Sequence, residues 1–342
     1  MADAVPPNEV SAEIERKVVP VNGIPTVISV LQPKDKPSKL SVVVIPGNPG
    51  LVEYYDVFIS SLYEASGQSL SIYGISHAGH SPILAEYTKH LENHERENSP
   101  LLTEKNNVDE TEVVQSCCIS TGTYSLQEQI THKKAFLEKY IPKNTKIILI
   151  GHSIGAYIIL KLMKEITREP DIVKAILLFP TIERMAASPN GRYVTPFVNY
   201  FKWLAVSTVS FVSYFPQSFM KSLVQWWFSG RCVQDDVVDT TLRLLSSEAS
   251  SNSLEMARCE MAEVTELDED VIASHLDKLI FYYGATDQWA PVSYYEDLKK
   301  KFPDGEIYLC DKGFEHAFVL TSSTQVGQMV WQWLDKIQSH YS

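Results

Sequence analysis

Short aliphatic runs that alternate with helix-like segments constrain this sequence more than any other feature. The runs do not alternate with polar residues, which is typical of strands buried on both faces of a sheet. They occupy residues 40–45, 70–75, 146–150, 175–179, 279–283 and 306–309. Helix-like segments occupy residues 126–140, 156–166, 294–302 and 325–337. This order predicts an α/β fold with a doubly wound, mostly parallel sheet.

An antiparallel edge is expected to begin the sheet. Two β-rich runs, residues 14–21 and 24–31, flank Asn22-Gly23. Asn-Gly accepts the positive φ angles of a tight two-residue turn better than other dipeptides. The pattern therefore predicts a hairpin at the N-terminal side of the parallel strands.

Composition excludes several classes of protein. The 30 Lys and Arg against 42 Asp and Glu give a net charge of −12, so no nucleic-acid partner is expected. Residues 1–17 lack the features of a signal peptide, and the five cysteines are odd in number and without metal-ligand spacing. We expect no export, a reducing compartment, buried or incidental thiols, and no metal or organic cofactor. With 44% apolar residues, residues 1–342 can form a single domain without disulfides.

Two stretches interrupt the alternation of strands and helices. Residues 81–118 hold eight acidic and three basic residues, which predicts a solvated loop insertion. Residues 194–230 carry only two charges, Lys202 and Lys221, but hold 11 of the 36 aromatic residues. They open a predicted lid or cap insertion over residues 194–277. No run of about 20 apolar residues is unbroken, so no ordinary membrane-spanning helix is expected.

The sequence Gly151-His152-Ser153-Ile154-Gly155 matches the G-x-S-x-G pattern of a nucleophile elbow. The position of the motif is stronger evidence than the pattern itself, because the motif follows an aliphatic strand and begins a helix. A serine there takes a strained backbone conformation, and side chains two positions to either side would collide with neighbouring backbone. Ser153 is therefore the predicted nucleophile of an α/β-hydrolase fold.

An activated serine needs a base and a group that orients the base. In this fold the chain order is serine, acid, histidine. Asp287 follows the strand at 279–283, and His316 follows the next strand, so both lie at the sheet edge where ligands bind. Asp311 is the nearest rival acid but is too close to His316 along the chain to orient it easily. His152 is expected to pack or to line the site.

The oxyanion of acyl transfer needs two donors, usually backbone N–H groups. Ile154, directly after the nucleophile, supplies the first. The loop 46–50 follows an early strand and supplies the second; because Pro49 has no N–H, Asn48 is the candidate. His77 and His80 follow the strand at 70–75 and are expected to be structural.

Taken together, these motifs closely resemble the lipid droplet-associated hydrolase family. The resemblance is carried by residues 45–50, 75–80, 150–155, 178–185, 188–191, 281–284 and 316–318. The stretch 179–191 is far more specific than the elbow. The resemblance implies an α/β-hydrolase fold, Ser153 as nucleophile, residence on lipid droplets and the endoplasmic reticulum, and a weak sterol ester hydrolase activity. It implies nothing for residues 81–118.

We interpret the chain as a serine hydrolase of lipid carboxylic esters, with Ser153, His316 and Asp287 as its triad. Two alternatives remain open: another acyl-transfer enzyme, such as a thioesterase or acyltransferase, and a droplet protein that keeps the fold to bind or organise lipid.

For residues 194–230 we expect a proline-bent helical hairpin, broken at Pro216, that lies in a droplet monolayer or in the endoplasmic reticulum membrane. It would be monotopic and would face the cytosol, because clustered Trp and Tyr favour a lipid interface. The alternative is an insertion packed wholly on the protein core.

Overall fold

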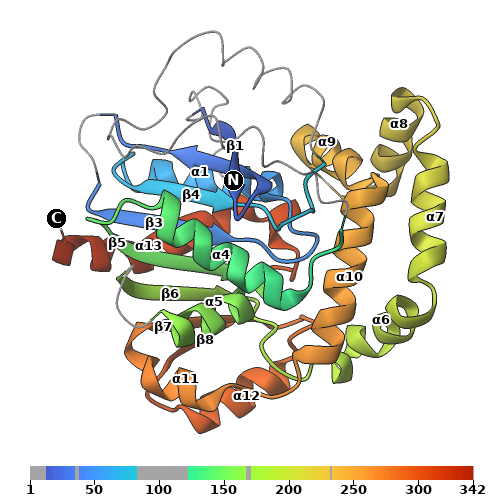
Figure 1. Ribbon diagram of the computed structural model, residues 1–342. Helices are drawn as coiled ribbons and strands as arrows, with labels where there is room; N and C mark the ends of the chain where they lie inside the picture. The colour runs from blue at the N-terminus through green and yellow to red at the C-terminus, as the bar shows by residue number, and fades with distance from the viewer. Residues whose placement is uncertain (1–12, 35–37, 83–121, 167–170, 232, 342) are drawn as a thin grey trace, which may run out of the picture.

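The computed structural model describes residues 13–34, 38–82, 122–166, 171–231 and 233–341. Within these ranges, eight strands form one sheet in the order β1-β2-β4-β3-β5-β6-β7-β8 (Figure 1). Their bounds are β1 Glu15–Val21, β2 Ile24–Leu31, β3 Leu40–Ile45, β4 Ser71–Ile75, β5 Lys146–His152, β6 Ile172–Leu178, β7 Leu279–Gly284 and β8 Glu306–Cys310. The pairs β1–β2 and β2–β4 are antiparallel and all others are parallel, which confirms the predicted sheet and its antiparallel edge.

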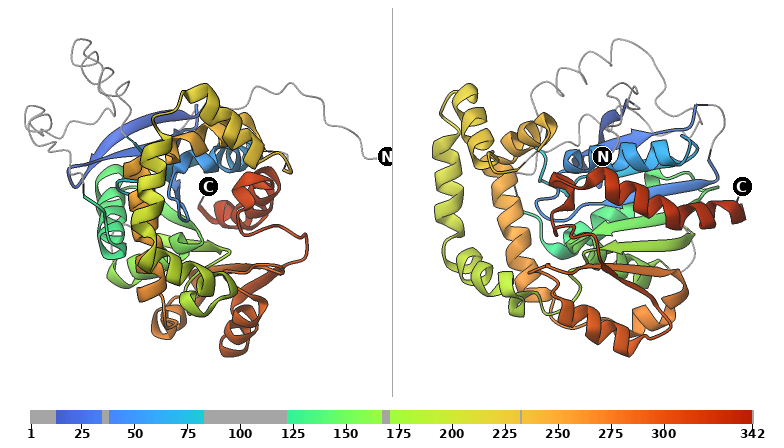
Figure 2. Two further views of the ribbon diagram at one scale, coloured as in Figure 1. Left: turned by 90° about the vertical axis from the view of Figure 1, so that its right-hand side faces the viewer. Right: turned by 180° about the vertical axis from the view of Figure 1, so that it is seen from behind.

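Helices cover both faces of the sheet, as the unbroken aliphatic runs require. On one face lie α4 (Leu126–Tyr140), α5 (Ile154–Glu165) and α12 (Val292–Lys301); on the other lie α1 (Asp56–Ala65) and α13 (Ser323–Tyr341), seen in the right-hand view of Figure 2. Side chains of β3 divide between the two faces: Val43 and Ile45 join the core under α4 and α5, and Val42 and Val44 join the core under α1 and α13. This period of two places each strand between two apolar layers.

A helical insertion separates β6 from β7 and stands beyond the carboxyl ends of the parallel strands (Figure 1). It contains α6 Pro189–Tyr200, α7 Lys202–Val212, α8 Gln217–Trp227, α9 Asp235–Leu244 and α10 Ser247–Glu263; the short helix α11 Glu269–Ser274 follows the insertion and packs on α5. Its helices thus begin before the expected start at residue 194. Four single 3-10 turns complete the described elements: η1 Val52–Tyr55, η2 Met185–Ala187, η3 Leu276–Lys278 and η4 Phe318–Leu320.

The predicted break at Pro216 is present, but the hairpin is not. Pro216 caps α8, and α7 ends before it. The two helices do not pack along each other; α7 packs on α10, and α8 packs on α9. The reason is that the buried side chains of α8, Met220 and Val224, face the insertion, and Val224 joins the core that contains Val237 and Val238 of α9.

The outer side of α6 to α8 leaves large apolar side chains exposed. None of the residues of α7 is buried, so this helix is only partly covered by α10, on which it packs. Among the described residues, the only exposed large apolar side chain elsewhere is Tyr308. We call the others the outer aromatic surface: Tyr193, Phe197, Tyr200, Phe201, Trp203, Leu204, Phe211, Tyr214, Phe215, Phe219, Leu223, Trp226 and Trp227.

The structure also bears on the expectations for the cysteines, for the acidic loop and for membrane-spanning helices. Cys259 and Cys310 are free and buried, as expected; Cys117, Cys118 and Cys232 lie outside the described residues. The expected acidic loop 81–118 also lies outside them from residue 83 onward. In the part of the chain that the structure describes, no helix combines the length and the apolar character needed to cross a membrane.

Candidate active site

Ser153 lies at the sharp turn between β5 and α5. Its backbone has φ 53° and ψ −121°, a conformation that costs energy for a residue with a side chain. A Cβ on Gly155 would come within 2.3 Å of the Ile45 carbonyl oxygen, and one on Gly151 within 2.7 Å of the Gly155 backbone. Both glycines are therefore required for this turn, which presents the serine at the edge of the sheet.

The predicted acid and histidine meet at this serine. His316 Nε2 lies 3.0 Å from Ser153 Oγ, and His316 Nδ1 lies 2.7 Å from Asp287 Oδ2. The other carboxylate oxygen of Asp287 accepts the backbone N–H groups of Trp289 at 2.7 Å and Ala290 at 3.1 Å. The Asp287 side chain is completely buried, whereas that of His316 remains 18% exposed. Thus the acid is fixed, and the histidine is accessible from outside. Asp287, and not Asp311, is the partner of His316.

The two predicted oxyanion donors belong to segments that lie directly against Ser153. Ile154 is the first residue of α5, where a backbone N–H has no partner within the helix. Asn48 follows Gly47, and a Cβ on Gly47 would lie 2.9 Å from Ser153 Cβ, so this loop passes directly against the nucleophile. The Gly47 N–H already donates to Tyr55 Oη at 2.7 Å. Among the described residues the Asn48 N–H has no hydrogen-bond partner, which leaves it as the candidate in this loop.

The side chain of Asn48 is attached to α10 of the insertion. Its Nδ2 donates to the Ser253 carbonyl oxygen at 2.9 Å and to Glu260 Oε1 at 3.1 Å. Glu260 is buried, and this burial raises the pKa of its carboxyl to about 8. Sequence reasoning missed Glu260, because a glutamate in a helix of mixed polarity carries no signal that it faces inward.

The histidines after β4 support the loop that carries Asn48. The Nδ1 atom of His80 lies 2.6 Å from the Pro49 carbonyl oxygen, and the His77 N–H donates to the Gly50 carbonyl oxygen at 2.8 Å. Burial lowers the pKa of His80 to about 4, which keeps the ring neutral. Neither contact involves the triad, in keeping with the structural role expected for both histidines.

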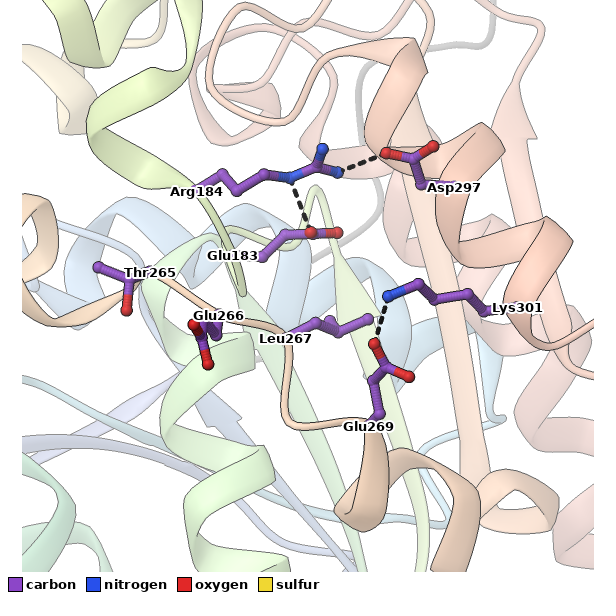
Figure 3. A pocket seen from close by; sticks show the side chains of 8 residues that line it. All are labelled: Glu183, Arg184, Thr265, Glu266, Leu267, Glu269, Asp297 and Lys301. Atoms are coloured by element: carbon purple, nitrogen blue, oxygen red, sulfur yellow. Dashed lines mark hydrogen bonds and ion pairs between the residues drawn. The ribbon is translucent and has the colours of Figure 1, made fainter.

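A separate pocket of about 330 Å³ lies beside the specific stretch 179–191 (Figure 3). None of the three triad residues lines it. Arg184 pairs with Glu183 at 2.8 Å and with Asp297 at 2.7 Å, and Lys301 pairs with Glu269. These ion pairs connect the segments that line the pocket.

The same stretch joins the two ends of the helical insertion. The N–H of Arg184 donates to the Thr265 carbonyl oxygen at 2.9 Å, and the N–H of Met185 donates to the Val264 carbonyl oxygen at 3.0 Å. Tyr294 Oη donates to the Arg184 carbonyl oxygen at 3.1 Å. Residues 184–185 and 264–265 thus form a closed neck through which the insertion enters and leaves.

No group of three or more His, Cys, Asp or Glu side chains within the described ranges could hold a metal ion.

The sheet order, the helical insertion after β6 and the strained serine after β5 define a protein with the α/β-hydrolase fold. Solved structures agree. An epoxide hydrolase from Vigna radiata superposes with a TM-score of 0.61 at 14% identity, covering 96% of this chain and 100% of that one. A thermophilic esterase from Thermogutta terrifontis gives 0.55 at 13% identity, covering 95% and 99%. At such identities these structures show the fold alone.

Sequence comparison gives the family. The family model for lipid-droplet associated hydrolase matches residues 38–319. Relatives named lipid droplet-associated hydrolase include those of Gallus gallus, 38% identical with 86% of this chain and 85% of the relative covered, and Homo sapiens, 36% identical with 86% and 84% covered. That of Drosophila melanogaster is 34% identical, with 87% and 89% covered. The chain belongs to the lipid-droplet associated hydrolase family, which confirms the resemblance seen in its motifs.

Proposed function

We propose that this protein is a serine hydrolase of lipid carboxylic esters, with Ser153 as nucleophile, His316 as general base and then acid, and Asp287 as the group that orients His316. The observation that carries the proposal is the continuous hydrogen-bonded chain from Asp287 through His316 to Ser153. A serine hydroxyl is a weak nucleophile, and a chain of this geometry is what activates it.

The proposed reaction has two halves. Ser153 Oγ bonds to the ester carbonyl carbon while His316 Nε2 takes the hydroxyl proton. The oxyanion accepts hydrogen bonds from the N–H groups of Asn48 and Ile154. The carbon–oxygen bond to the alcohol then breaks, and His316 returns its proton to that oxygen. Water attacks the acyl-serine by the same route and releases the carboxylic acid.

For substrate and location, we propose sterol esters at the surface of lipid droplets and of the endoplasmic reticulum, facing the cytosol. The family's name supports a droplet location for its members. The outer aromatic surface supports a lipid contact, because Trp and Tyr side chains favour the boundary between water and acyl chains. It belongs to the same insertion as α10, which contacts Asn48, so a single helix links the proposed lipid contact to the candidate site.

A fluorophosphonate probe tests the chemistry directly. The purified protein should be labelled at Ser153, and Ser153→Ala should not be labelled. Ser207→Ala, which removes an exposed hydroxyl on α7, is the matched control and should react like the wild type. Absence of labelling in the wild type would contradict the proposed nucleophile.

Product analysis then tests the substrate. Incubation with a cholesteryl ester in detergent micelles or droplets should release free fatty acid and sterol. Transfer of the acyl group to an added alcohol or thiol, without free acid, would instead identify an acyltransferase.

A further inference from the structure

A buried tyrosine connects two parts of the candidate site. Tyr55 is the last residue of η1, and only 3% of it is exposed. Its Oη accepts the N–H of Gly47 at 2.7 Å and lies 2.6 Å from Nδ1 of His152. The other ring nitrogen of His152, Nε2, lies 2.9 Å from the carbonyl oxygen of His316. The chain of contacts therefore begins beside Asn48, passes beside Ser153 and ends at the proposed base.

The backbone groups at the two ends of this chain, together with a neutral His152 ring, determine the direction of every hydrogen bond in it. A backbone N–H can only donate, so Gly47 donates and Tyr55 accepts. The His316 carbonyl oxygen can only accept, so Nε2 of His152 carries a hydrogen and donates it. A neutral ring then has no hydrogen on Nδ1, and Nδ1 accepts the hydroxyl hydrogen of Tyr55. With a neutral ring, no other arrangement of the hydrogens satisfies all three contacts.

The surroundings favour this single arrangement. Rings of Phe179 and Phe318 contact His152, with centroids 6.2 and 5.0 Å from its own. Burial, and next the positive charge that His316 can carry, hold the pKa of His152 well below its usual range. Burial raises the pKa of Tyr55 above its usual value, so its hydroxyl keeps its hydrogen.

We infer that Tyr55 and His152 are positioning residues, whose hydrogen-bond chain holds the Asn48 donor and the His316 imidazole in register with Ser153. The inference rests on the proposed function, because it assigns a role in that reaction. It also explains how two adjacent imidazoles, with centroids 5.2 Å apart, keep separate roles. His316 is free to take the serine proton, whereas His152 stays neutral, since a proton on its Nδ1 would break the contact with Tyr55.

Three variants separate the parts of the chain. Tyr55→Phe removes the acceptor for Gly47 and the donor to His152. In His152→Gln the side-chain amide reaches the place of Nε2 and can donate to the His316 carbonyl, but nothing accepts from Tyr55. In His152→Asn the amide oxygen takes the place of Nδ1 and accepts from Tyr55, but the contact with His316 is lost.

Hydrolysis of p-nitrophenyl butyrate, a small soluble ester, is the assay. Tyr55→Phe should lower kcat by about 10- to 100-fold while KM stays close to that of the wild type, because misplaced groups impair the transition state more than ground-state binding. The loss of kcat in His152→Gln or in His152→Asn should be smaller than the loss in the double variant Tyr55→Phe/His152→Ala. Tyr63→Phe is the matched control: Tyr63 is equally buried, and its hydroxyl donates to the Gln32 carbonyl oxygen at 2.7 Å, away from the triad. It should keep the wild-type kcat.

NMR of the histidine ring nitrogens provides a second readout that needs no variant to fold. In the wild type, His152 should carry hydrogen on Nε2 and none on Nδ1. A protonated Nδ1, or a Tyr55→Phe enzyme with unchanged kcat, would overturn the inference.

The two proposals fail in different ways. A wild type that neither hydrolyses esters nor reacts with a fluorophosphonate contradicts the proposed function, and the inferred role in catalysis falls with it. A reactive wild type with an unaffected Tyr55→Phe variant contradicts only the positioning role.

Discussion

The candidate site and the outer aromatic surface are opposite kinds of surface on one molecule. At the site, Asp287 is buried and both its carboxylate oxygens accept hydrogen bonds from the chain. On the outer side of the insertion, Tyr214 is 88% exposed and Trp227 is 74% exposed. The polar groups of the triad are paired with one another and with the backbone, whereas the apolar side chains on the outer side of the insertion are not covered by the protein. Exposed apolar area on this scale marks a region whose partner lies outside the chain.

Helix α10 lies between these two regions. On one side α7 packs on it, with an ion pair from Lys202 to Glu255 at 2.5 Å. On the other side Ser253 and Glu260 hold the side chain of Asn48. The surface proposed to meet lipid and the loop proposed to stabilise the oxyanion therefore contact the same helix through different residues. Substitutions can for this reason be directed at one region while the contacts of the other are kept.

Loss of the triad should be the largest effect and should leave the outer surface untouched. Ser153→Ala and His316→Ala should each lower ester turnover by about 10⁴- to 10⁶-fold, because no activated nucleophile remains. Binding to droplets should stay at the wild-type level. Steady-state kinetics and a flotation assay measure the two properties. Either variant keeping most of its activity would refute the mechanism.

The reverse experiment removes the surface and spares the site. Replacing Trp203, Tyr214, Trp226 and Trp227 with serine should weaken binding to phospholipid-coated droplets by about 100-fold or more, since each ring loses its apolar burial. Activity on p-nitrophenyl butyrate should persist. Because Met220 and Val224 remain buried, these substitutions are gentler than replacing residues 194–230 with a Gly-Ser linker. Tyr308→Ser, on β8, is the control. If the wild type, the fourfold variant and Tyr308→Ser bind droplets equally well, the outer aromatic surface has no role in lipid binding.

Substitutions in the loop 46–50 sharpen the position of the oxyanion donor. Gly47→Ala should lower kcat by about 10- to 100-fold, because its Cβ would meet Ser153 Cβ and displace the Asn48 N–H. Asn48→Ala keeps the backbone donor and should cost only a few-fold, about the value of one side-chain hydrogen bond. An Asn48→Ala loss as large as that of Ser153→Ala would make the side chain the donor.

The last prediction concerns stability, and not turnover, at the contact between the two regions. The raised pKa of Glu260, about 8 against an ordinary 4.5, means that the folded protein keeps this proton while the unfolded chain loses it. Between pH 4.5 and 8 the unfolding free energy should therefore fall by about 1.4 kcal/mol per pH unit from this group, with no further loss above pH 8. Below pH 4.5 the Glu260 carboxyl is protonated in both the folded and the unfolded state, so it no longer makes the unfolding free energy depend on pH.

Urea unfolding at several pH values checks this. Glu260→Gln should gain stability relative to the wild type as the pH rises from 5 to 8, because an amide does not ionise. Glu263→Gln, an exposed residue on the same helix, should show no such trend. A constant difference between Glu260→Gln and the wild type would mean that Glu260 ionises normally.

Local patterns were enough to predict most of the sheet and the positions of the site residues. The strand at β3 and the helix α4 have the predicted bounds, because unbroken aliphatic runs and a capping box at Ser125 and Glu128 are local signals. The positions of Asp287 and His316 follow from strand ends. The strand at 175–179 ends one residue early, at Leu178, since Phe179 takes a φ of 48°.

What the sequence could not predict depends on contacts between distant residues. Tyr55 reaches His152 across 97 positions, and Asn48 reaches Glu260 across 212, distances over which no periodic pattern extends. The expected hairpin at 194–230 failed for the same reason. Its helices were predicted to form a hairpin, yet α7 packs on α10 and α8 packs on α9, both of which follow later in the chain.

The closed neck at residues 184–185 and 264–265 has a consequence for how such proteins diversify. Because the insertion leaves the sheet almost where it entered, its length and sequence can change without moving β6 relative to β7. Segments with adjacent ends are tolerated as insertions into other domains. Helices α6 to α10 between the two ends can therefore differ between related proteins without any change in the sheet, as long as the contacts of α10 with Asn48 are kept.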